Sequence, residues 1–272
     1  MQLPVMPPIK PMLARATTTV PEADGLLYEP KWDGYRCVVF RDGDEVELSS
    51  RGQKSLTRYF PELIDPIRAQ LPRRCVVDCE VVVVTPDGLD FDLLGQRIHP
   101  AESRIERLSV ETPASLVVFD LLALDEVDLR PMAFIERRGA LVSLLADVIP
   151  PVHLSPVTDD PEVAQDWFRR FEGAGFDGVM AKDPAGTYQE NKRSQLKVKH
   201  KRTADCVVAG YRTHKDGEGI GSLLMGVYDD EGELHHLGVA ASFSVARRKE
   251  LIAELAPYED GALDDHPWRE WA

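Results

Sequence analysis

Residues 26–50 read LLYEPKWDGYRCVVFRDGDEVELSS. Their apolar and β-branched residues predict three strands, at 26–32, 35–41 and 45–50. A tight hairpin turn at Asp42-Gly43-Asp44 is expected between the last two. The segment Lys31-Trp32-Asp33-Gly34-Tyr35-Arg36 connects the first two, and a lysine in a Lys-x-Asp-Gly setting indicates an amine placed to attack phosphorus. Three fixed residues are a weak signal alone, so the rest of the chain must supply the context.

Outward from this stretch, predicted strands and helices mix without a regular βαβ rhythm. Further strands are expected at 75–85, 116–124, 177–182 and 195–199, and helices at 61–71, 91–98, 104–108, 133–147 and 161–172. This pattern predicts an α+β fold built on antiparallel sheets. The proline-rich residues 1–25 are expected to form an extended tether along the domain surface.

The chain changes character after residue 201. Three strands, at 206–212, 222–228 and 234–241, precede a helix that Ser244 should cap. They look like the opening of a small β-barrel, although too little chain remains for a complete five-stranded one. We therefore predict two domains, 1–201 and 202–272.

Composition narrows the class of protein. The chain has 272 residues and a net charge of −14, which argues against a protein that coats nucleic acid over its whole surface. Residues 192–202 nevertheless form a basic stretch without an acid, which fits either a phosphate track or a solvated face. The four cysteines show no Cys-x-x-Cys pair, which argues against zinc and favours a reducing compartment. With neither a signal peptide nor a bilayer-spanning apolar run, we expect a cytoplasmic protein.

A nucleophilic Lys31 needs help from its surroundings. Lysine has a reference pKa of about 10.4, so neighbouring cations or desolvation must favour its neutral form. Lys182, Lys199 and a bound metal could do this while neutralising a triphosphate. Mg²⁺ prefers hard oxygen ligands, and Glu80 and Asp177, each beside or within an apolar β segment, are the candidates. For a single charge in such a segment, a place on the wet face of a half-buried sheet is the simpler explanation.

These segments resemble the motifs of the covalent nucleotidyltransferases, which include ATP-dependent DNA ligases and capping enzymes. The segment at Lys31 resembles motif I, Ser50-Arg51-Gly52 motif Ia, and Val117-Val118-Phe119-Asp120-Leu121-Leu122 motif III. Asp177-Gly178-Val179-Met180-Ala181-Lys182 is similar to motif IV, and Leu196-Lys197-Val198-Lys199 to motif V. The stretches Pro8–Ala14 and Val239–Ser244 resemble the actinobacterial ligase C group, with the ligase domain of ligase D as a near neighbour.

The resemblance implies a role for each matching residue. Lys31 would attack the α-phosphorus of ATP, with Lys182 among the residues that bind the nucleotide. Glu29 would contact the adenine amino group, and Phe119 would stack on the ring. Arg36 would hold the ribose or a phosphate, and Arg51 the nucleotide or the 5′-phosphate of the nick. Glu80 would touch the ribose and the metal, Asp177 the metal, and Lys197 and Lys199 the α-phosphate.

It also implies ATP with Mg²⁺ or Mn²⁺ as cofactors and nicked double-stranded DNA as partner, for a monomer that works with other repair proteins. Two departures lie near the site: Asp177 stands where the family has glutamate, and Cys79 where an Asp-Gly-Glu strand has glycine. A third lies in residues 245–272, where nothing resembles the arginine- and lysine-bearing motif VI that orients pyrophosphate. We expect a truncated OB-fold barrel.

Without motif VI, attack on ATP should be slow, whereas a pre-adenylated nick should still be sealed. Comparing the sealing rates of an ordinary and a pre-adenylated nick tests this expectation. Equal, fast rates on both substrates would contradict it.

Two alternatives stay open at the level of sequence. One is an RNA ligase or a GTP-using capping enzyme. Glu29 is the discriminating residue, because its carboxylate can accept a hydrogen bond from the amino group of adenine. The other is a platform that binds nucleotide and DNA ends without catalysis, which predicts no covalent nucleotide.

Overall fold

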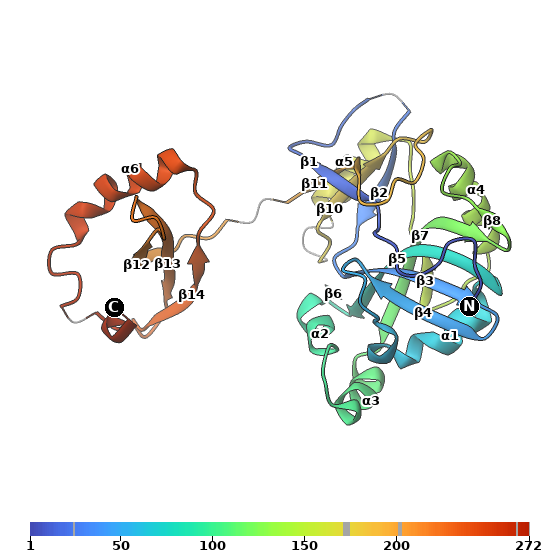
Figure 1. The fold of residues 1–272 in the computed structure, drawn as a ribbon, viewed down its shortest axis with the longest axis horizontal. Helices are drawn as coiled ribbons and strands as arrows, with labels where there is room; N and C mark the ends of the chain where they lie inside the picture. Colours follow the sequence, from blue (N-terminus) through green and yellow to red (C-terminus); the bar gives the residue numbers. More distant parts are fainter. Residues whose placement is uncertain (24, 171–174, 201–202, 265, 272) are drawn as a thin grey trace. The chain divides into compact units, whose positions relative to one another are not determined.

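The computed structural model describes residues 1–23, 25–170, 175–200, 203–264 and 266–271. Contacts divide the chain into two compact units, Met1–His200 and Lys201–Ala272 (Figure 1). The boundary expected between residues 201 and 202 lies outside the described residues. Every helix in the described ranges is too short or too polar to cross a bilayer.

The larger sheet of the first unit contains the hairpin expected from residues 35–50. Its strands run in the order β4-β3-β5-β7-β8, with β6 paired to β5 and β9 paired in parallel to β7. The strands are β3 (Tyr35–Asp42), β4 (Glu45–Ser50), β5 (Arg74–Thr85), β6 (Gly88–Leu89), β7 (Ala114–Leu124), β8 (Val127–Asp128) and β9 (Val152–Leu154). Gly43 turns the β3–β4 hairpin with a φ of 63°, which glycine adopts at little cost.

The smaller sheet of the first unit has the order β1-β11-β10-β2. It contains β1 (Leu13–Thr17), β2 (Leu27–Lys31), β10 (Gly178–Lys182) and β11 (Arg193–Lys199). Strand β10 is antiparallel to both β2 and β11, whereas β1 joins β11 in parallel. The α+β class with antiparallel sheets is therefore confirmed.

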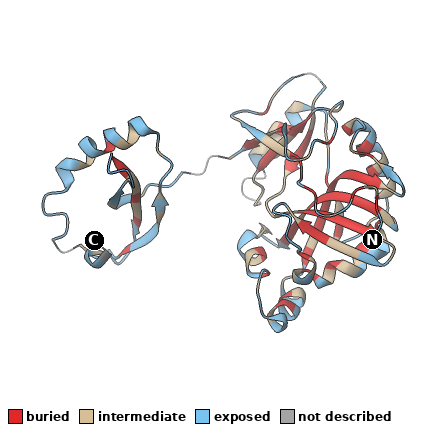
Figure 2. Cartoon of the chain, in the orientation of Figure 1, coloured by how far each residue is buried: buried red, intermediate tan, exposed pale blue. Residues whose placement is uncertain are grey.

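Helices pack around the two sheets. They are α1 (Ile64–Gln70), α2 (Phe91–Gln96), α3 (Glu102–Glu111), α4 (Phe134–Leu144) and α5 (Pro161–Arg170), preceded by the 3-10 turns η1 (Thr57–Tyr59) and η2 (Pro61–Leu63). Buried residues concentrate on the strands of the larger sheet (Figure 2). Each fully buried Val, Leu or Phe there contributes about 1.5–3 kcal/mol.

The N-terminal segment differs from the surface tether that its prolines suggested. Leu3, Val5, Ile9 and Met12 are buried in a cluster with residues of the larger sheet, and residues 13–17 form the edge strand β1. Proline prevents a helix but does not prevent burial of the apolar side chains between the prolines. The segment is therefore part of the core.

The second unit contains one antiparallel sheet, in the order β12-β13-β14, and a helix. Its elements are β12 (Val207–Thr213), β13 (Ile220–Tyr228), β14 (Leu234–Ala240) and α6 (Val245–Leu255), followed by the 3-10 turns η4 (Ala256–Tyr258) and η5 (Arg269–Trp271). Ser244 caps α6 as expected, because its hydroxyl accepts a hydrogen bond from the amide of Arg247. Leu251 of this helix packs on Ile220 and Leu223 of the sheet.

Candidate functional site

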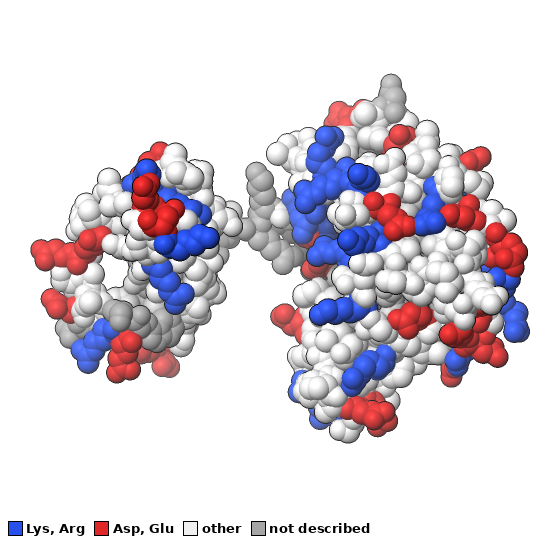
Figure 3. All heavy atoms as spheres, viewed as in Figure 1, with Lys and Arg blue, Asp and Glu red and all other residues white. Residues whose placement is uncertain are grey.

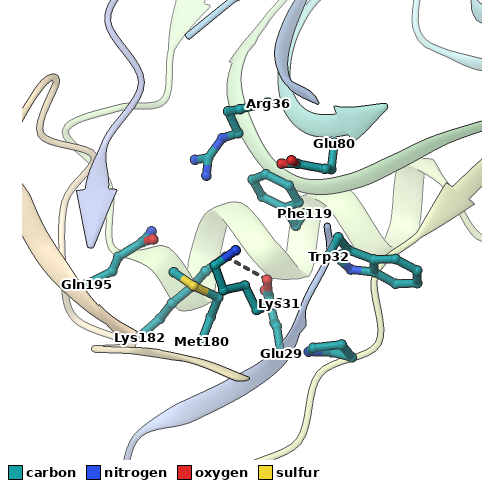
Figure 4. Close-up of a pocket in the computed structure, with 10 residues that line it drawn as sticks. Glu29, Lys31, Trp32, Arg36, Glu80, Phe119, Met180, Lys182 and Gln195 are labelled. Atoms are coloured by element: carbon teal, nitrogen blue, oxygen red, sulfur yellow. Dashed lines mark hydrogen bonds and ion pairs between the residues drawn. The ribbon is translucent and has the colours of Figure 1, made fainter. Parts of the chain in front are cut away.

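A pocket lies between the two sheets of the first unit. The smaller sheet supplies its floor, and the larger sheet supplies Arg36, Glu80 and Phe119 (Figure 4). The residues that line it are Glu29, Pro30, Lys31, Trp32, Arg36, Glu80, Phe119, Met180, Lys182 and Gln195. Six of the ten residues selected from the sequence therefore line one pocket, although they come from five different strands.

Strand register arranges the floor in rows. Gly178 on β10 pairs with Lys31 on one side and Lys199 on the other. Two residues further along, Met180 pairs with Glu29 and Lys197. Because side chains alternate along a strand, these rows share one face of the sheet. The floor therefore has lysines at the Gly178 end and a buried carboxylate further in.

Two glycines make this close arrangement possible. Gly178 has a φ of 139°, and a Cβ there would lie 1.9 Å from the carbonyl oxygen of Val198. At Gly34 a Cβ would lie 2.2 Å from the carbonyl oxygen of Val81 and 3.0 Å from the Cγ of Glu80. Glycine in the Lys-x-Asp-Gly segment thus allows the chain after Lys31 to pass directly over β5, next to Glu80.

Lys31 and Lys199 share one counter-ion. The Nζ atom of each lies 2.5 Å from Oδ2 of Asp177, and the amide of Asp177 donates a hydrogen bond to the carbonyl oxygen of Lys31. Burial opposes ionisation of Asp177, but the bonds from Lys199 and Lys31 outweigh it and lower its pKa. Burial also lowers the pKa of Lys197, helped by the charges of Lys199 and Lys31. Three lysines thus surround one carboxylate at the Lys31 end of the pocket.

Glu29 and Lys182 form a buried ion pair further along the floor. The Nζ atom of Lys182 lies 2.7 Å from Oε2 of Glu29, and both side chains are almost inaccessible to solvent. The other carboxylate oxygen of Glu29, Oε1, is buried and accepts no hydrogen bond from the residues that the structure describes. A buried acceptor without a donor is costly, so this oxygen is a place where a ligand N–H would gain a hydrogen bond.

The side of the pocket that the larger sheet supplies is stabilised by a polar network that the sequence did not reveal. Asp78, fully buried on β5, accepts two hydrogen bonds from Arg36 at 2.5 and 2.6 Å and one from the hydroxyl of Tyr188 at 2.6 Å. The Arg36 guanidinium lies 4.5 Å from the ring centroid of Phe119. The sequence pattern could have indicated Asp78, because it is an acid within an apolar strand, but nothing in the pattern indicated Tyr188.

Trp32 lines the pocket and also packs against neighbouring residues at its edge. Its indole N–H donates to the hydroxyl of Ser155 at 3.0 Å, and its ring packs 4.8 Å from that of Phe176. Lys31 precedes Trp32, and Phe176 precedes Asp177, so this ring contact ties the nucleophile candidate to its counter-ion.

The remaining candidates lie as follows. Asp120 does not reach the pocket, because it forms a fully buried ion pair with Arg137 at 2.8 Å. The exposed Arg51 is not among the lining residues, although its amide donates to the carbonyl oxygen of Arg36 at 3.2 Å. Asp177, Lys197 and Lys199 likewise do not line the pocket. Asp177 and Lys199 join Lys31 at its mouth through the ion pairs described above, and Lys197 lies near enough for the charges of Lys31 and Lys199 to help lower its pKa.

Glu80 suits a hard cation better than the other acids of the pocket. Its carboxylate has no hydrogen-bond or ion-pair partner among the described residues, and burial raises its pKa to about 7 despite the charges of Arg36 and Lys31. A carboxylate held without a partner gains from a divalent cation. However, no group of three His, Cys, Asp or Glu side chains gathers into a metal site within the described ranges. Any cation must therefore take further ligands from the substrate or from water.

The shift at Glu80 predicts a pH-dependent stability. A pKa raised on folding means that the folded state holds a proton which the unfolded state has released, so stability falls as pH rises from about 4.5 to 7. Glu80→Gln removes this loss. In metal-free buffer, we expect the free energy of unfolding of the variant, relative to that of the wild type, to increase by about 2 kcal/mol from pH 5 to pH 8. Urea unfolding at both pH values measures the difference, with the exposed Glu111→Gln as control. A constant difference across this range would contradict the prediction.

A cluster of lysines around one carboxylate, beside a pocket with a partnerless acid and a buried acceptor, matches the site expected for a covalent nucleotidyltransferase. The comparisons with known proteins make the assignment narrower. Residues 11–201 match the family model described as ATP dependent DNA ligase domain. The chain therefore belongs to the ATP-dependent DNA ligases, which are nucleotidyltransferases that seal nicks in DNA.

Individual relatives agree with this family. The chain is 54% identical to DNA ligase C of Mycobacterium tuberculosis over 277 residues, covering all of this chain and 76% of that protein. It is 52% identical to DNA ligase C2 of Mycolicibacterium smegmatis, with the same coverage. Among solved structures, mycobacterial DNA ligase D complexed with ATP and MES matches with a TM-score of 0.57 and 28% identity, over 92% of this chain and 78% of that one.

Proposed function

We propose that the pocket binds ATP and that Lys31 becomes covalently adenylated. The observation that carries this proposal is the ion pairing of Lys31 and Lys199 with one carboxylate at the mouth of a pocket that ends in the unsatisfied Oε1 of Glu29. A triphosphate suits the lysine end, and the amino group of adenine supplies the donor that Glu29 lacks. Phe119 on one side and Met180 on the other provide apolar surfaces for a purine ring.

In the first step, the neutral amine of Lys31 attacks the α-phosphorus. A P–N bond forms, the bond from the α-phosphorus to the bridging oxygen breaks, and pyrophosphate leaves. Lys197 and Lys199 stabilise the negative charge that develops on the α-phosphate, and Arg36 holds the ribose or a phosphate. Lys182 is already neutralised by Glu29, so its role is to orient that carboxylate toward the base.

In the later steps, the adenylate moves from Lys31 to the 5′-phosphate at the nick, which forms a P–O–P linkage and frees the amine. The 3′-hydroxyl then attacks the 5′-phosphorus, a phosphodiester forms, and AMP leaves. Arg51, exposed beside the strand of Arg36, is suited to grip the 5′-phosphate end or the nucleotide.

We further propose that Mg²⁺ or Mn²⁺ binds at Glu80, which also contacts the ribose, with Asp177 as a second ligand. When bound there, such a cation neutralises the triphosphate and favours the neutral amine of Lys31. Asp177 is shorter than the glutamate usual at its position and is engaged by two lysines, so a water would complete its reach.

The units have separate proposed roles. Residues 1–201 serve as the adenylation domain, and the three-stranded unit from 202 to 272 belongs to an OB-fold barrel that helps to hold nicked duplex DNA. Lysine and arginine side chains gather over β1 and β11 (Figure 3), which suits a duplex backbone. We place the enzyme in cytoplasmic DNA repair, as a monomer that works with other repair proteins; its four cysteines are free thiols, which suits a reducing compartment.

The use of ATP rather than GTP tests the role of Glu29. Guanine carries a carbonyl oxygen where adenine carries its amino group, so GTP would place an acceptor against the acceptor Oε1 of Glu29. We expect covalent labelling by ATP to exceed labelling by GTP at least about 100-fold, as at sites that reject a mismatched hydrogen-bonding group. Intact-mass spectrometry with each nucleotide and Mg²⁺ makes the comparison. Equal labelling by the two nucleotides would argue for a capping-type enzyme.

A further inference from the structure

Gln195 is a buried amide that the proposed chemistry does not use. It lies on β11, is 5% exposed and lines the pocket. Its side-chain amide makes no hydrogen bond to the described residues, and its nitrogen and oxygen stay accessible from the pocket, where a ligand can bond to them. Figure 4 shows it across Met180 and Lys182 from Glu29, with its amide turned toward the middle of the pocket.

Strand register places Gln195 at the base end of the floor. Lys197, two residues later on the same strand, pairs with Met180, and Lys199 pairs with Gly178 beside Lys31. Along β11 the side chains on this face are therefore Lys199 and Lys197 near the phosphates and Gln195 beyond them. On the other side of β10, Glu29 pairs with Met180 and is therefore level with Lys197, one row before Gln195.

The other polar groups of the pocket are already committed or are of the wrong kind. Lys182 is bound to Glu29, and Arg36 is held by two bonds to Asp78. The carboxylate of Glu29 can only accept hydrogen bonds. It can therefore accept one from the adenine amino group, but it cannot donate one to a ring nitrogen. Among the described residues that line the pocket, Gln195 is the one with a side-chain amide, which both donates and accepts.

We propose that Gln195 determines base specificity together with Glu29. Its carbonyl accepts the second N–H of the adenine amino group, and its NH₂ donates to the ring nitrogen beside that group, N1 or N7. Glutamine matches this adjacent donor and acceptor of adenine with two hydrogen bonds. The inference rests on the nucleotide site proposed above, and it adds the residue that bonds the second amino N–H and one ring nitrogen of the base.

Calorimetric titration with ATP tests the proposal, in a Lys31→Ala background so that no covalent step interferes. Gln195→Met keeps the length and apolar stem of the side chain and removes the amide. We expect the Kd for ATP to rise about ten-fold, which is the usual effect of losing one bidentate base contact. Gln195→Glu, which loses the N–H donor, should weaken binding as well, and Gln189→Met, at an exposed glutamine of the same unit, should leave it unchanged.

Two base analogues make the test specific to the ring nitrogen. In 1-deaza-ATP and 7-deaza-ATP, a C–H group replaces N1 or N7. We expect one analogue to bind the Lys31→Ala protein more weakly than ATP does, and this penalty to vanish in Gln195→Met. Unchanged penalties for both analogues, or an unchanged Kd for ATP, would overturn the proposal. Thermal unfolding of each variant shows that the fold is intact.

The result is separable from a failure of the proposed function. If the chain with Lys31 intact gives no adduct but the Gln195 comparison behaves as expected, the catalytic role of Lys31 is wrong and base reading by Gln195 stands. If Lys31 is adenylated and the Gln195 variants bind ATP and both analogues normally, only the inference about Gln195 falls.

Discussion

Lys31→Ala will abolish the covalent nucleotide adduct. Lys31 ends β2 at the mouth of the pocket, and its Nζ is held at 2.5 Å from Asp177. None of the lysines that the structure describes near the pocket is placed to replace it. Lys182 is buried in its pair with Glu29, and Lys199 lies on the far side of β10 with nearly half of its side chain exposed. Because the attacking amine forms the new bond itself, its removal leaves no path to the adduct.

Intact-mass spectrometry before and after incubation with ATP and Mg²⁺ measures this effect. We expect the wild type to gain one adenylate that pyrophosphate removes, and Lys31→Ala to gain none. Lys10→Ala, an exposed lysine of the same unit, should behave as the wild type. An adduct that survives in Lys31→Ala would refute the assignment of the nucleophile. If the wild type gains no adduct but binds nicked DNA, the chain acts as a binding platform.

The second large effect concerns stability. Arg137→Met will lower the free energy of unfolding by about 3–5 kcal/mol, the usual cost of removing one partner of a buried ion pair. Arg137 and Asp120 are 0% and 1% exposed. The guanidinium donates two hydrogen bonds to Asp120, at 2.8 and 2.9 Å, and further ones to the carbonyl oxygens of Met132 and Gly186. Without it, a carboxylate is left buried and uncompensated.

Urea unfolding measures this loss. The control is Arg107→Met, which removes an exposed pair with Glu111 and should cost no more than about 0.5 kcal/mol. In the double variant Arg137→Met/Asp120→Leu no unpaired charge remains, and we expect much of the stability to return. Equal losses for Arg137→Met and Arg107→Met would show that the buried pair contributes no more than a surface one. Because Asp120 follows Phe119 on β7, the single variant should also weaken ATP binding.

Much of the fold could be predicted because local sequence patterns determine it. The hairpin of β3 and β4 needs only alternating apolar residues and a turn at Gly43, and α6 needs only an apolar stripe and the hydroxyl of Ser244. The predicted helix at 133–147 exists as α4, although it is shorter at both ends. Strand β1 was missed because its five residues follow a proline-rich segment and form a strand only by pairing with β11.

The sequence by itself indicated the class of enzyme and the residues proposed to carry its chemistry. Lys31, Glu29, Glu80, Asp177 and the motif V lysines stand in a fixed order, and that order was sufficient to indicate a nucleotidyltransferase. The reason is that each motif is short and local, so its residue types and spacing can be read directly from the chain.

Only the tertiary structure decided what these residues touch. It joined Lys31 and Lys199 to Asp177, left Oε1 of Glu29 without a donor, held Arg36 on Asp78 and Tyr188, and turned the amide of Gln195 into the pocket. The longest of these contacts, between Lys31 and Asp177, joins residues 146 positions apart in the sequence. Such contacts depend on strand order and register, which a sequence fixes through the packing of the whole domain and not through any one segment.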